Sequence, residues 1–203
     1  ILRKISVNLD IFFNLKNENK ISLKAENSDF NLLCLPPDNF PSFSDDFASK
    51  EITFKKNKLL SLLNKTKISI SGDDTRHYLN GIFLHITETD NQNFLTGVST
   101  DSHRLSSSSL EIDKLNDFTS LILPRKTVYQ LCSLLDEAEE NVIMKTSETR
   151  IQFQLGKIKL ISKVIDGKFP DYKKVVPLEN KKSLIVPTKD FIDSVERVTT
   201  VSV

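Results

Sequence analysis

The chain has 203 residues, and its 28 Lys and Arg nearly balance its 27 Asp and Glu, giving a formal net charge of +1. A protein that holds nucleic acid by charge alone carries a large excess of basic residues, so this balance excludes a tight phosphate binder of that kind. A hydrophobic fraction of 38%, with 13 Phe, suffices for a folded core and excludes wholesale disorder. The sequence has no run of about 18 apolar residues, so it predicts no membrane-spanning helix.

The first 48 residues predict a small antiparallel sheet. Apolar and polar residues alternate around residues 5–9, 21–25 and 30–34, with Asn-rich breaks between the runs. Alternation with a period of two is typical of half-buried strands. Leu35-Pro36-Pro37 ends this sheet, and the Ser- and Asp-rich residues 41–50 predict a linker to the next unit.

Residues 49–178 predict a complete domain of mixed helices and strands. Leu residues spaced by three and four mark an amphipathic helix from Asn57 to about Thr66, with Asn57 expected as its N-cap. The predicted elements, in chain order, are a strand at 52–54, the helix at 57–66, strands at 81–87 and 94–99, a strand at 121–123, a helix after Pro124, and strands at 142–144, 151–155 and 158–164.

Residues 179–203 predict the beginning of a third unit. A strand at 184–186 leads through Pro187 into a helix whose apolar stripe includes Phe191 and Val195. The N-terminus has neither an initiator Met nor a signal-peptide pattern, and the last residues follow directly on this helix. We therefore expect a segment of a longer protein, cut at both ends.

Two internal repeats predict the architecture. Phe40-Pro41 recurs as Phe169-Pro170, and each pair precedes a strand that feeds a helix. Within residues 49–178, a strand feeding a helix occurs twice, each time followed by further strands. Repeats define the structural unit. The sequence thus predicts an α+β fold of tandem domains, each built from two strand–helix–strands halves, with the first domain ending near residue 48.

The cysteines and histidines predict neither a metal site nor a cofactor. Cys34 and Cys132 are isolated in apolar surroundings, which favours reduced, buried thiols of a cytoplasmic protein. His77, His85 and His103 lack the spacing that places two imidazoles on one helix face.

Asp101-Ser102-His103 offers one alternative, a small hydrolase that uses Asp101 and His103. Three adjacent residues cannot form a catalytic triad, because nucleophile, base and orienting group converge from separate elements. The sequence also lacks a Gly-x-Ser-x-Gly elbow. A polar loop after a strand is the simpler interpretation, and a β-rich scaffold without nucleic acid is a further alternative.

Four stretches together resemble the β subunit of bacterial DNA polymerase III, the sliding clamp. Asp74 to Gly81 is similar to the start of that family's middle domain, and Thr100 to Leu105 resembles its Thr-Asp-Gly-His-Arg-Leu signature. Pro124-Arg125-Lys126 resembles the start of the second helix, and Asp166 to Tyr172 is similar to Asp-Gly-Arg-Phe-Pro-Asp-Tyr. The order and spacing follow the family over most of residues 20–200.

The resemblance implies a DNA-clamp fold and a non-catalytic role. Members form a closed homodimeric ring around double-stranded DNA, with helices facing the hole and antiparallel sheets outside, and they make the polymerase processive. The implied partners are double-stranded DNA, bound without sequence preference, and the polymerase catalytic subunit and clamp loader, which dock short peptide motifs. We expect a cytoplasmic protein that requires no cofactor, and we do not expect this truncated chain to close a ring.

The resemblance also assigns site residues. A partner-peptide pocket is implied at Arg76, Leu79, Thr100, Ser102, His103, Arg104, Leu105, Pro170, Lys174 and Val175, where Leu79, Leu105, Pro170 and Val175 would offer apolar surface. His77 and Tyr78 map to a DNA-facing segment, and Lys58 and Lys65 lie on the polar side of a helix expected to face DNA.

This sequence departs from the family pattern at three of these positions. Ser102 stands where the family usually has Gly, Lys173-Lys174 replaces an Arg-rich pair, and His77 occupies a common Tyr position.

Overall fold

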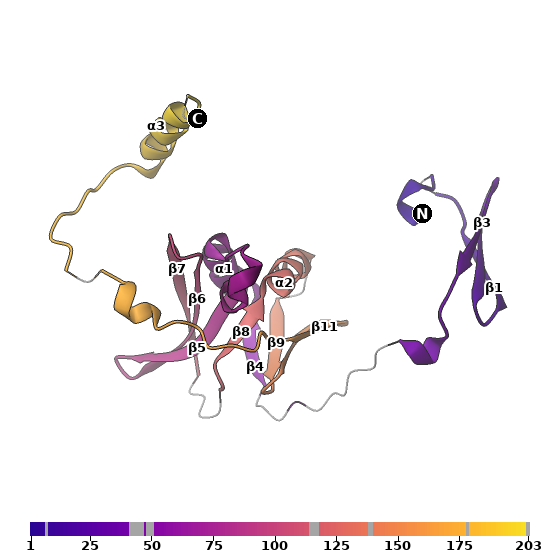
Figure 1. The fold of residues 1–203 in the computed structure, drawn as a ribbon, viewed down its shortest axis with the longest axis horizontal. Helices are drawn as coiled ribbons and strands as arrows, with labels where there is room; N and C mark the ends of the chain where they lie inside the picture. The colour runs from indigo at the N-terminus through magenta and orange to yellow at the C-terminus, as the bar shows by residue number, and fades with distance from the viewer. Residues whose placement is uncertain are drawn as a thin grey trace. The chain divides into compact units, whose positions relative to one another are not determined.

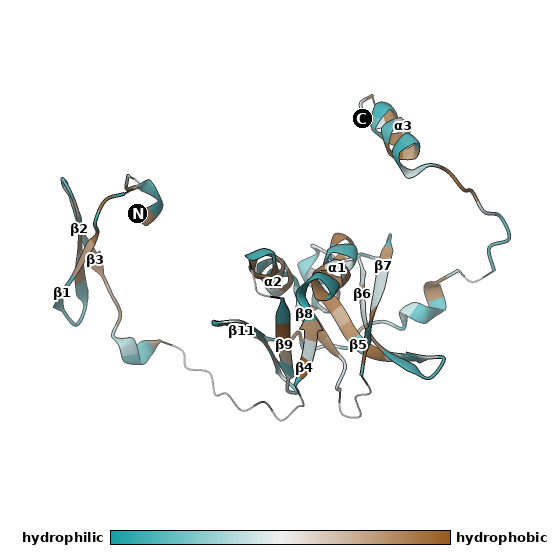
Figure 2. Ribbon diagram, turned by 180° about the vertical axis from the view of Figure 1, so that it is seen from behind, coloured by the Kyte–Doolittle hydropathy of each residue, from teal (hydrophilic) through white to brown (hydrophobic). Residues whose placement is uncertain are grey.

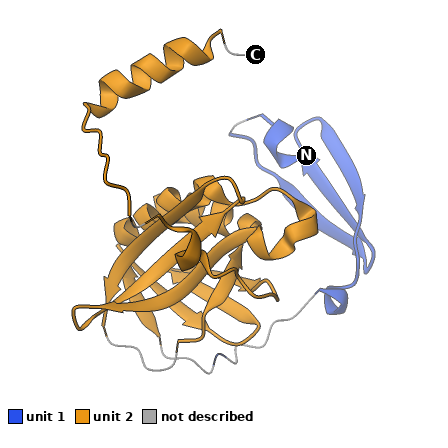
Figure 3. Cartoon of the chain, turned by 60° about the vertical axis from the view of Figure 1, so that its left-hand side comes forward, with its two compact units in different colours: residues 1–47 blue, residues 48–203 orange. Residues whose placement is uncertain are grey.

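The structure is a computed structural model that describes residues 1–6, 8–40, 47, 51–113, 118–137, 140–177 and 179–201. It divides into two compact units, Ile1–Phe47 and Ala48–Val203 (Figure 3). The predicted linker at 41–50 lies, apart from residue 47, outside the described residues.

The first unit is a three-stranded antiparallel sheet in the order β1-β2-β3. Its elements are η1 (Leu2–Lys4), β1 (Phe12–Asn17), β2 (Lys20–Ala25), β3 (Ser28–Leu33) and η2 (Pro37–Asn39). The strand expected at 5–9 is wrong over its described residues, because Asn8 has a φ of 72°, which an extended strand does not accommodate. β1, which the alternation did not indicate, forms from the adjacent Phe12 and Phe13 instead.

The second unit contains two four-stranded antiparallel sheets with two helices on one side of them (Figure 1). The sheet orders are β11-β10-β9-β4 and β7-β6-β5-β8. The elements are β4 (Ile52–Lys55), α1 (Lys56–Thr66), η3 (Lys67–Ser69), η4 (Asp74–Leu79), β5 (Gly81–Thr89), β6 (Gln92–Thr100), β7 (Leu105–Ile112), β8 (Leu121–Pro124), α2 (Arg125–Glu137), β9 (Asn141–Thr146), β10 (Arg150–Leu155), β11 (Ile158–Lys163), η5 (Tyr172–Val175) and α3 (Thr188–Thr199).

The two predicted halves are confirmed, and they interlock. Each half runs strand, helix and three strands, but its first strand joins the sheet of the other half: β4 pairs with β9, and β8 pairs with β5. A bridge between Ile122 and Ile165 also links β8 to the chain after β11. Neither sheet is therefore complete until both halves have folded.

One large core lies between the helices and the sheets. Leu59, Leu62 and Leu63 of α1 are almost fully buried, as is the apolar stripe of α2 around Leu131. The strands beneath are correspondingly apolar (Figure 2). Gly97 lets α1 approach β6 closely, because a Cβ there would lie 2.8 Å from Cδ2 of Leu62.

Three local expectations are wrong. Asn57 is not the N-cap of α1: β4 runs directly into the helix, which begins at Lys56, and the N–H of Lys56 donates to the carbonyl of Glu140 at 2.8 Å. Residues 184–186 form no strand, although α3 is confirmed at Thr188–Thr199. Both cysteines are free, but only Cys132 is buried, whereas Cys34 is half-buried.

Candidate functional site

The face of sheet β7-β6-β5-β8 that points away from the helices carries a second apolar cluster. Along β5, Ile82 and Leu84 point into the large core, whereas Phe83 points to the opposite face. The buried members of this cluster are Leu79, Val98, Ile122 and Phe169, and Tyr78, Phe83, Leu105, Ile165 and Tyr172 pack against them. Three segments far apart in the sequence thus meet on one sheet face.

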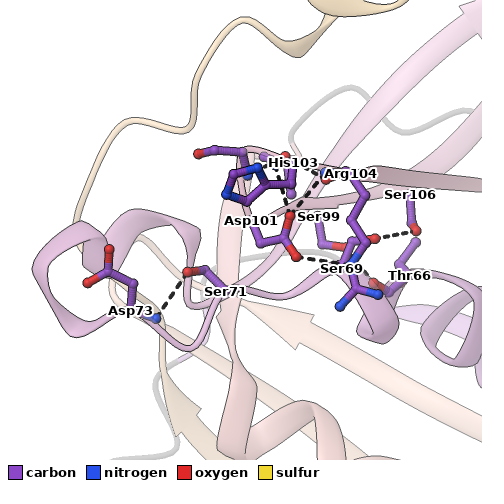
Figure 4. Close-up of polar contacts among 11 residues, drawn as sticks. Thr66, Ser69, Ser71, Asp73, Ser99, Asp101, His103, Arg104 and Ser106 are labelled. Atoms are coloured by element: carbon purple, nitrogen blue, oxygen red, sulfur yellow. Dashed lines mark hydrogen bonds and ion pairs between the residues drawn. The ribbon is translucent and has the colours of Figure 1, made fainter. Parts of the chain in front are cut away.

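The first segment is the connection between β6 and β7, which is held by its own polar groups (Figure 4). The Asp101 carboxylate accepts the backbone N–H groups of His103 and Arg104, each at 3.0 Å, and Nε of Arg104 at 2.9 Å. These hydrogen bonds, chiefly those from the backbone, lower the pKa of Asp101 to about 2. Thr100 Oγ1 donates to the carbonyl of Arg104 at 2.8 Å, which closes the turn.

This geometry argues against a hydrolase. The Asp101 carboxylate already accepts hydrogen bonds from two backbone amides and from Nε of Arg104. Its hydrogen bond with His103 comes from the backbone N–H and not from the imidazole. A general base needs a pKa near the working pH, and a carboxylate with a pKa of about 2 is too weak a base.

The second segment is η4, which Arg76 joins to the turn. Asp73 caps this helix by accepting the N–H of Thr75 at 2.9 Å, and it also accepts Nε of Arg76 at 3.1 Å. Nη1 of Arg76 then donates to Oγ of Ser102 at 2.7 Å. Arg76 is therefore fixed from both sides, with its guanidinium beside the turn.

The third segment is the chain after β11. The rings of Phe169 and Phe83 stack with centroids 4.9 Å apart and an interplanar angle of 4°. Pro170, the next residue, is exposed, and Val175 at the end of η5 is 71% exposed. Lys174 pairs with Asp171 at 3.3 Å.

The predicted pocket residues thus lie on three segments that the structure brings together, with one difference. Leu79, expected to offer surface, is only 3% exposed and instead forms the floor with Val98. Leu105 is half-buried, whereas His103 and Arg104 are exposed. The sequence reasoning missed Phe83, Val98 and Tyr172, although the alternation along β5 and β6 could have indicated that both sheet faces are apolar there.

A cleft of about 920 Å³ lies beside the start of α2. Its lining includes His77, Asn80, Arg125, Lys126 and Tyr129. Cζ of Arg125 lies 5.9 Å from the Tyr129 ring centroid, and Nζ of Lys67 lies 5.8 Å from it. The cleft therefore combines positive charge with an aromatic ring that is 47% exposed.

Of the predicted DNA-facing residues, His77 and Tyr78 divide between the cleft and the second apolar cluster. His77 lies at the cleft, where its Nε2 is 3.2 Å from the carbonyl oxygen of Asp166. Tyr78, by contrast, packs against the second apolar cluster and meets the His77 ring edge-on at 5.8 Å. Lys58 and Lys65 are exposed on α1, as expected. Arg125, Lys126 and Tyr129 were not assigned a role from the sequence, which singled out only the start of this helix.

Within the part of the chain that the structure describes, no three His, Cys, Asp or Glu residues gather where they could hold a metal ion. In the same part, no helix is both long enough and apolar enough to cross a membrane.

Comparison with known proteins identifies the family. Residues 53–171 match the family described as DNA polymerase III beta subunit, central domain. The beta sliding clamp of Caulobacter vibrioides is 35% identical over 204 residues, which cover 100% of this chain and 55% of that protein. The beta sliding clamp of Rickettsia bellii is 33% identical over 90% of this chain and 48% of its own length.

Solved structures give the same result. A sliding clamp from Bartonella birtlesii bound to griselimycin superposes with a TM-score of 0.90 at 38% identity, covering 100% of this chain and 54% of that one. A clamp from Caulobacter crescentus gives 0.91 at 35% identity, covering 99% and 54%. The chain therefore belongs to the family of the DNA polymerase III beta subunit, the sliding clamp, and it spans about half the length of the curated relatives it matches.

Proposed function

We propose that the chain is the middle part of a processivity clamp, a non-catalytic ring that encircles double-stranded DNA and tethers the replicative polymerase in the cytoplasm. The observation that supports this most is the match of residues 53–171 to the central domain of the family. In this proposal, residues 49–178 are the complete middle domain. Residues 1–48 close a first domain, residues 179–203 open a third, and the intact protein is a homodimer.

Partner peptides bind, in this proposal, over the second apolar cluster. Leu105, Pro170 and Val175 supply apolar surface, and Arg76 and Arg104 supply donors at its rim. Apolar anchors surrounded by a few fixed polar groups are typical of peptide sites. Because Asp73 and Ser102 fix Arg76, its donors need little further ordering when a peptide arrives.

DNA passes, in this proposal, along the helix side of the unit. Lys58 and Lys65 on α1, together with Arg125 and Lys126 at the cleft, provide positive charge there, and His77 lies beside them. With a net charge of only +1, the attraction to phosphate is weak and sensitive to salt. A linked ring needs no stronger attraction, because topology keeps it on the DNA.

The peptide site is tested by fluorescence polarisation of a labelled clamp-binding peptide with the intact protein. The double variant Arg104→Ala/Leu105→Ala removes a rim donor and an apolar anchor, so we expect affinity to fall at least about tenfold. Glu111→Ala, an exposed change farther along β7, is the matched control and should leave affinity unchanged. Unchanged binding in the double variant would refute the site.

The ring is tested by retention on nicked circular plasmid after loading. Retention should disappear when the plasmid is linearised, because a ring slides off a free end. Lys65→Glu/Lys126→Glu should accelerate loss from the linearised plasmid at low salt, whereas Lys157→Glu, which changes the charge of the turn between β10 and β11, should not. A complex that survives linearisation would indicate a groove binder instead.

A further inference from the structure

His85 lies at the centre of the contacts that fix the third segment of the peptide site. Its ring stacks on Phe83 with centroids 4.9 Å apart, and Phe83 in turn stacks on Phe169. Nε2 of His85 lies 3.0 Å from Oη of Tyr172. His85 therefore contacts η5 directly, and through Phe83 it is linked to the chain just before Pro170.

The hydrogen bonds define which ring nitrogen carries the proton. Nδ1 of His85 lies 3.2 Å from the carbonyl oxygen of Ile86, which can only accept, so Nδ1 carries the hydrogen and donates. In the neutral ring Nε2 is then an acceptor, and the Tyr172 hydroxyl donates to it. Both nitrogens of the neutral imidazole are satisfied in this arrangement.

We infer that His85 is a positioning residue for the proposed peptide site, because the neutral ring holds Tyr172, and with it Pro170, Lys174 and Val175, over the sheet. When His85 is protonated, Nε2 can still donate to the Tyr172 hydroxyl. Release of the segment is favoured instead because a charged ring is costly in this half-buried place beside Lys173, and release weakens peptide binding. The inference rests on the proposed function for its effect on peptides, but not for the attachment of the segment itself.

The surroundings of His85 determine the direction of the pH effect. Burial is the main cause that lowers its pKa, and the positive charge of Lys173 lowers it further, against the opposing bond to Ile86. The titratable hydroxyl of Tyr172 faces the ring from η5, and its neighbour across β6 is the uncharged Thr96. The pKa of His85 is therefore lower when the segment is docked than when it is released. The contribution of His85 to docking is fully present above the usual His pKa and decreases as pH falls below it.

The attachment is tested by amide hydrogen exchange of residues 169–175 in the 203-residue chain, corrected for intrinsic rates, at pH 7.5 and pH 5.5. For the unmodified chain we expect faster exchange at pH 5.5, by at most about tenfold, because pH 5.5 lies about one unit below the usual His pKa. His85→Phe keeps a stacked ring but cannot titrate. Its exchange at pH 7.5 should rise about 2- to 10-fold, with no further rise at pH 5.5.

Two comparisons keep this result specific. Tyr172→Phe removes only the hydroxyl. The double variant His85→Phe/Tyr172→Phe should exchange no faster at pH 7.5 than either single variant, because the two residues are partners in one hydrogen bond. His103→Gln, which alters an exposed histidine on the β6–β7 connection, should retain the acid-induced increase. An acid-induced increase that persists in His85→Phe, or additive single effects, would overturn the inference.

The consequence for function is measured separately, with the labelled peptide and the intact protein. Affinity should fall from pH 7.5 to pH 5.5 by at most about tenfold, and His85→Phe should abolish most of that fall. If the intact protein binds no peptide at either pH, the proposed function fails while hydrogen exchange still decides the role of His85. If peptide binds with the same pH ratio in His85→Phe, the inference fails and the proposed function stands.

Discussion

Ser102 has a φ of 79°, in the left-handed region, and forms the tip of the connection between β6 and β7. For a residue with a Cβ this conformation costs about 1–2 kcal/mol. A Gly at this position would avoid that cost. The serine retains one compensating interaction, because its hydroxyl accepts from Arg76 at 2.7 Å.

We therefore expect Ser102→Gly to be more stable than Ser102→Ala by about 0.5–1 kcal/mol in free energy of unfolding. Both variants lack the hydroxyl, so the comparison isolates the backbone conformation. Urea unfolding of the two variants measures the difference. Equal stabilities would mean that the turn relaxes to a negative φ once the hydroxyl is lost.

Asp101 gives the same turn a dependence on pH. Its pKa is lowered in the folded chain to about 2, chiefly by the backbone amides of Arg104 and His103, so the stabilisation is present above the usual Asp pKa. It is lost as pH falls from about 4 towards about 2. Asp101→Asn keeps an oxygen that accepts the same amides, but it cannot titrate.

In Asp101→Asn we expect a smaller decrease in stability between pH 4 and pH 2 than in the unmodified chain. Thermal unfolding at half-unit pH steps measures this decrease. Asp90→Asn, in the turn between β5 and β6, is the matched control and should follow the unmodified curve. Parallel curves for Asp101→Asn would show that the turn does not depend on the charge.

At the scale of elements, Gly81 allows β5 to approach β8. A Cβ at this position would collide with the carbonyl oxygen of Leu123 and would lie 2.9 Å from Cγ2 of Ile122. Backbone atoms of a paired strand cannot yield as the end of a long side chain can. The pairing of β5 with β8 is the contact that joins the two halves in this sheet, so a disturbance here affects both.

Gly81→Ala should lower the free energy of unfolding by about 2–3 kcal/mol or more. Gly72→Ala is the matched control: a Cβ there would meet only the flexible Nη1 of Arg125, at 3.2 Å, and should cost less than about 1 kcal/mol. Urea unfolding of both variants makes the comparison. Similar losses in the two would contradict a steric role for Gly81.

The helices and most strands could be predicted from the sequence because their apolar spacing is strong. The α1 and α2 stripes and the alternation of β10 correspond to buried positions in the structure. β7 could not be predicted, because Leu105 is followed by four serines and its pairing with β6 is what makes it a strand. The strand expected at 184–186 fails for the opposite reason: its apolar residues have no described strand to pair with.

The candidate site was predictable only in part. The motifs around Thr100 and Asp166 place it, but spacing along the chain does not reveal that Phe169 stacks on Phe83 or that Tyr172 reaches His85. Such contacts depend on how β5 and the chain after β11 come together in three dimensions. Leu79 shows this limit of sequence-based prediction, because it belongs to a site motif and was expected at the surface, but it is buried beneath the site.

At the scale of the whole molecule, the two apolar clusters lie within the second unit, whereas the first unit buries only Leu23 and Ala25 among its described apolar residues. Every buried member of the two apolar clusters falls between residues 52 and 169. The stability of this region thus depends on interactions among its own residues. This supports the proposal that residues 49–178 are one domain.

Residues 49–178 expressed alone should therefore unfold cooperatively, with a free energy within about 0.5 kcal/mol of the same region in the 203-residue chain. Urea unfolding followed by circular dichroism provides the comparison. Ending the piece at residue 164 removes Phe169 and should cost at least about 2 kcal/mol. Equal stability of the shorter piece would place the domain boundary earlier.

The link between His85 and Tyr172 spans 87 positions, so it also bears on the order of folding. The hairpin of β5 and β6 needs only local contacts, whereas closing so long a loop is slow and costs entropy first. A growing chain can therefore form much of its secondary structure before the third segment arrives. For the proposed peptide site, this order means that the site is completed only when the whole unit has folded, and that an incomplete chain that stops before residue 169 would present no competing site.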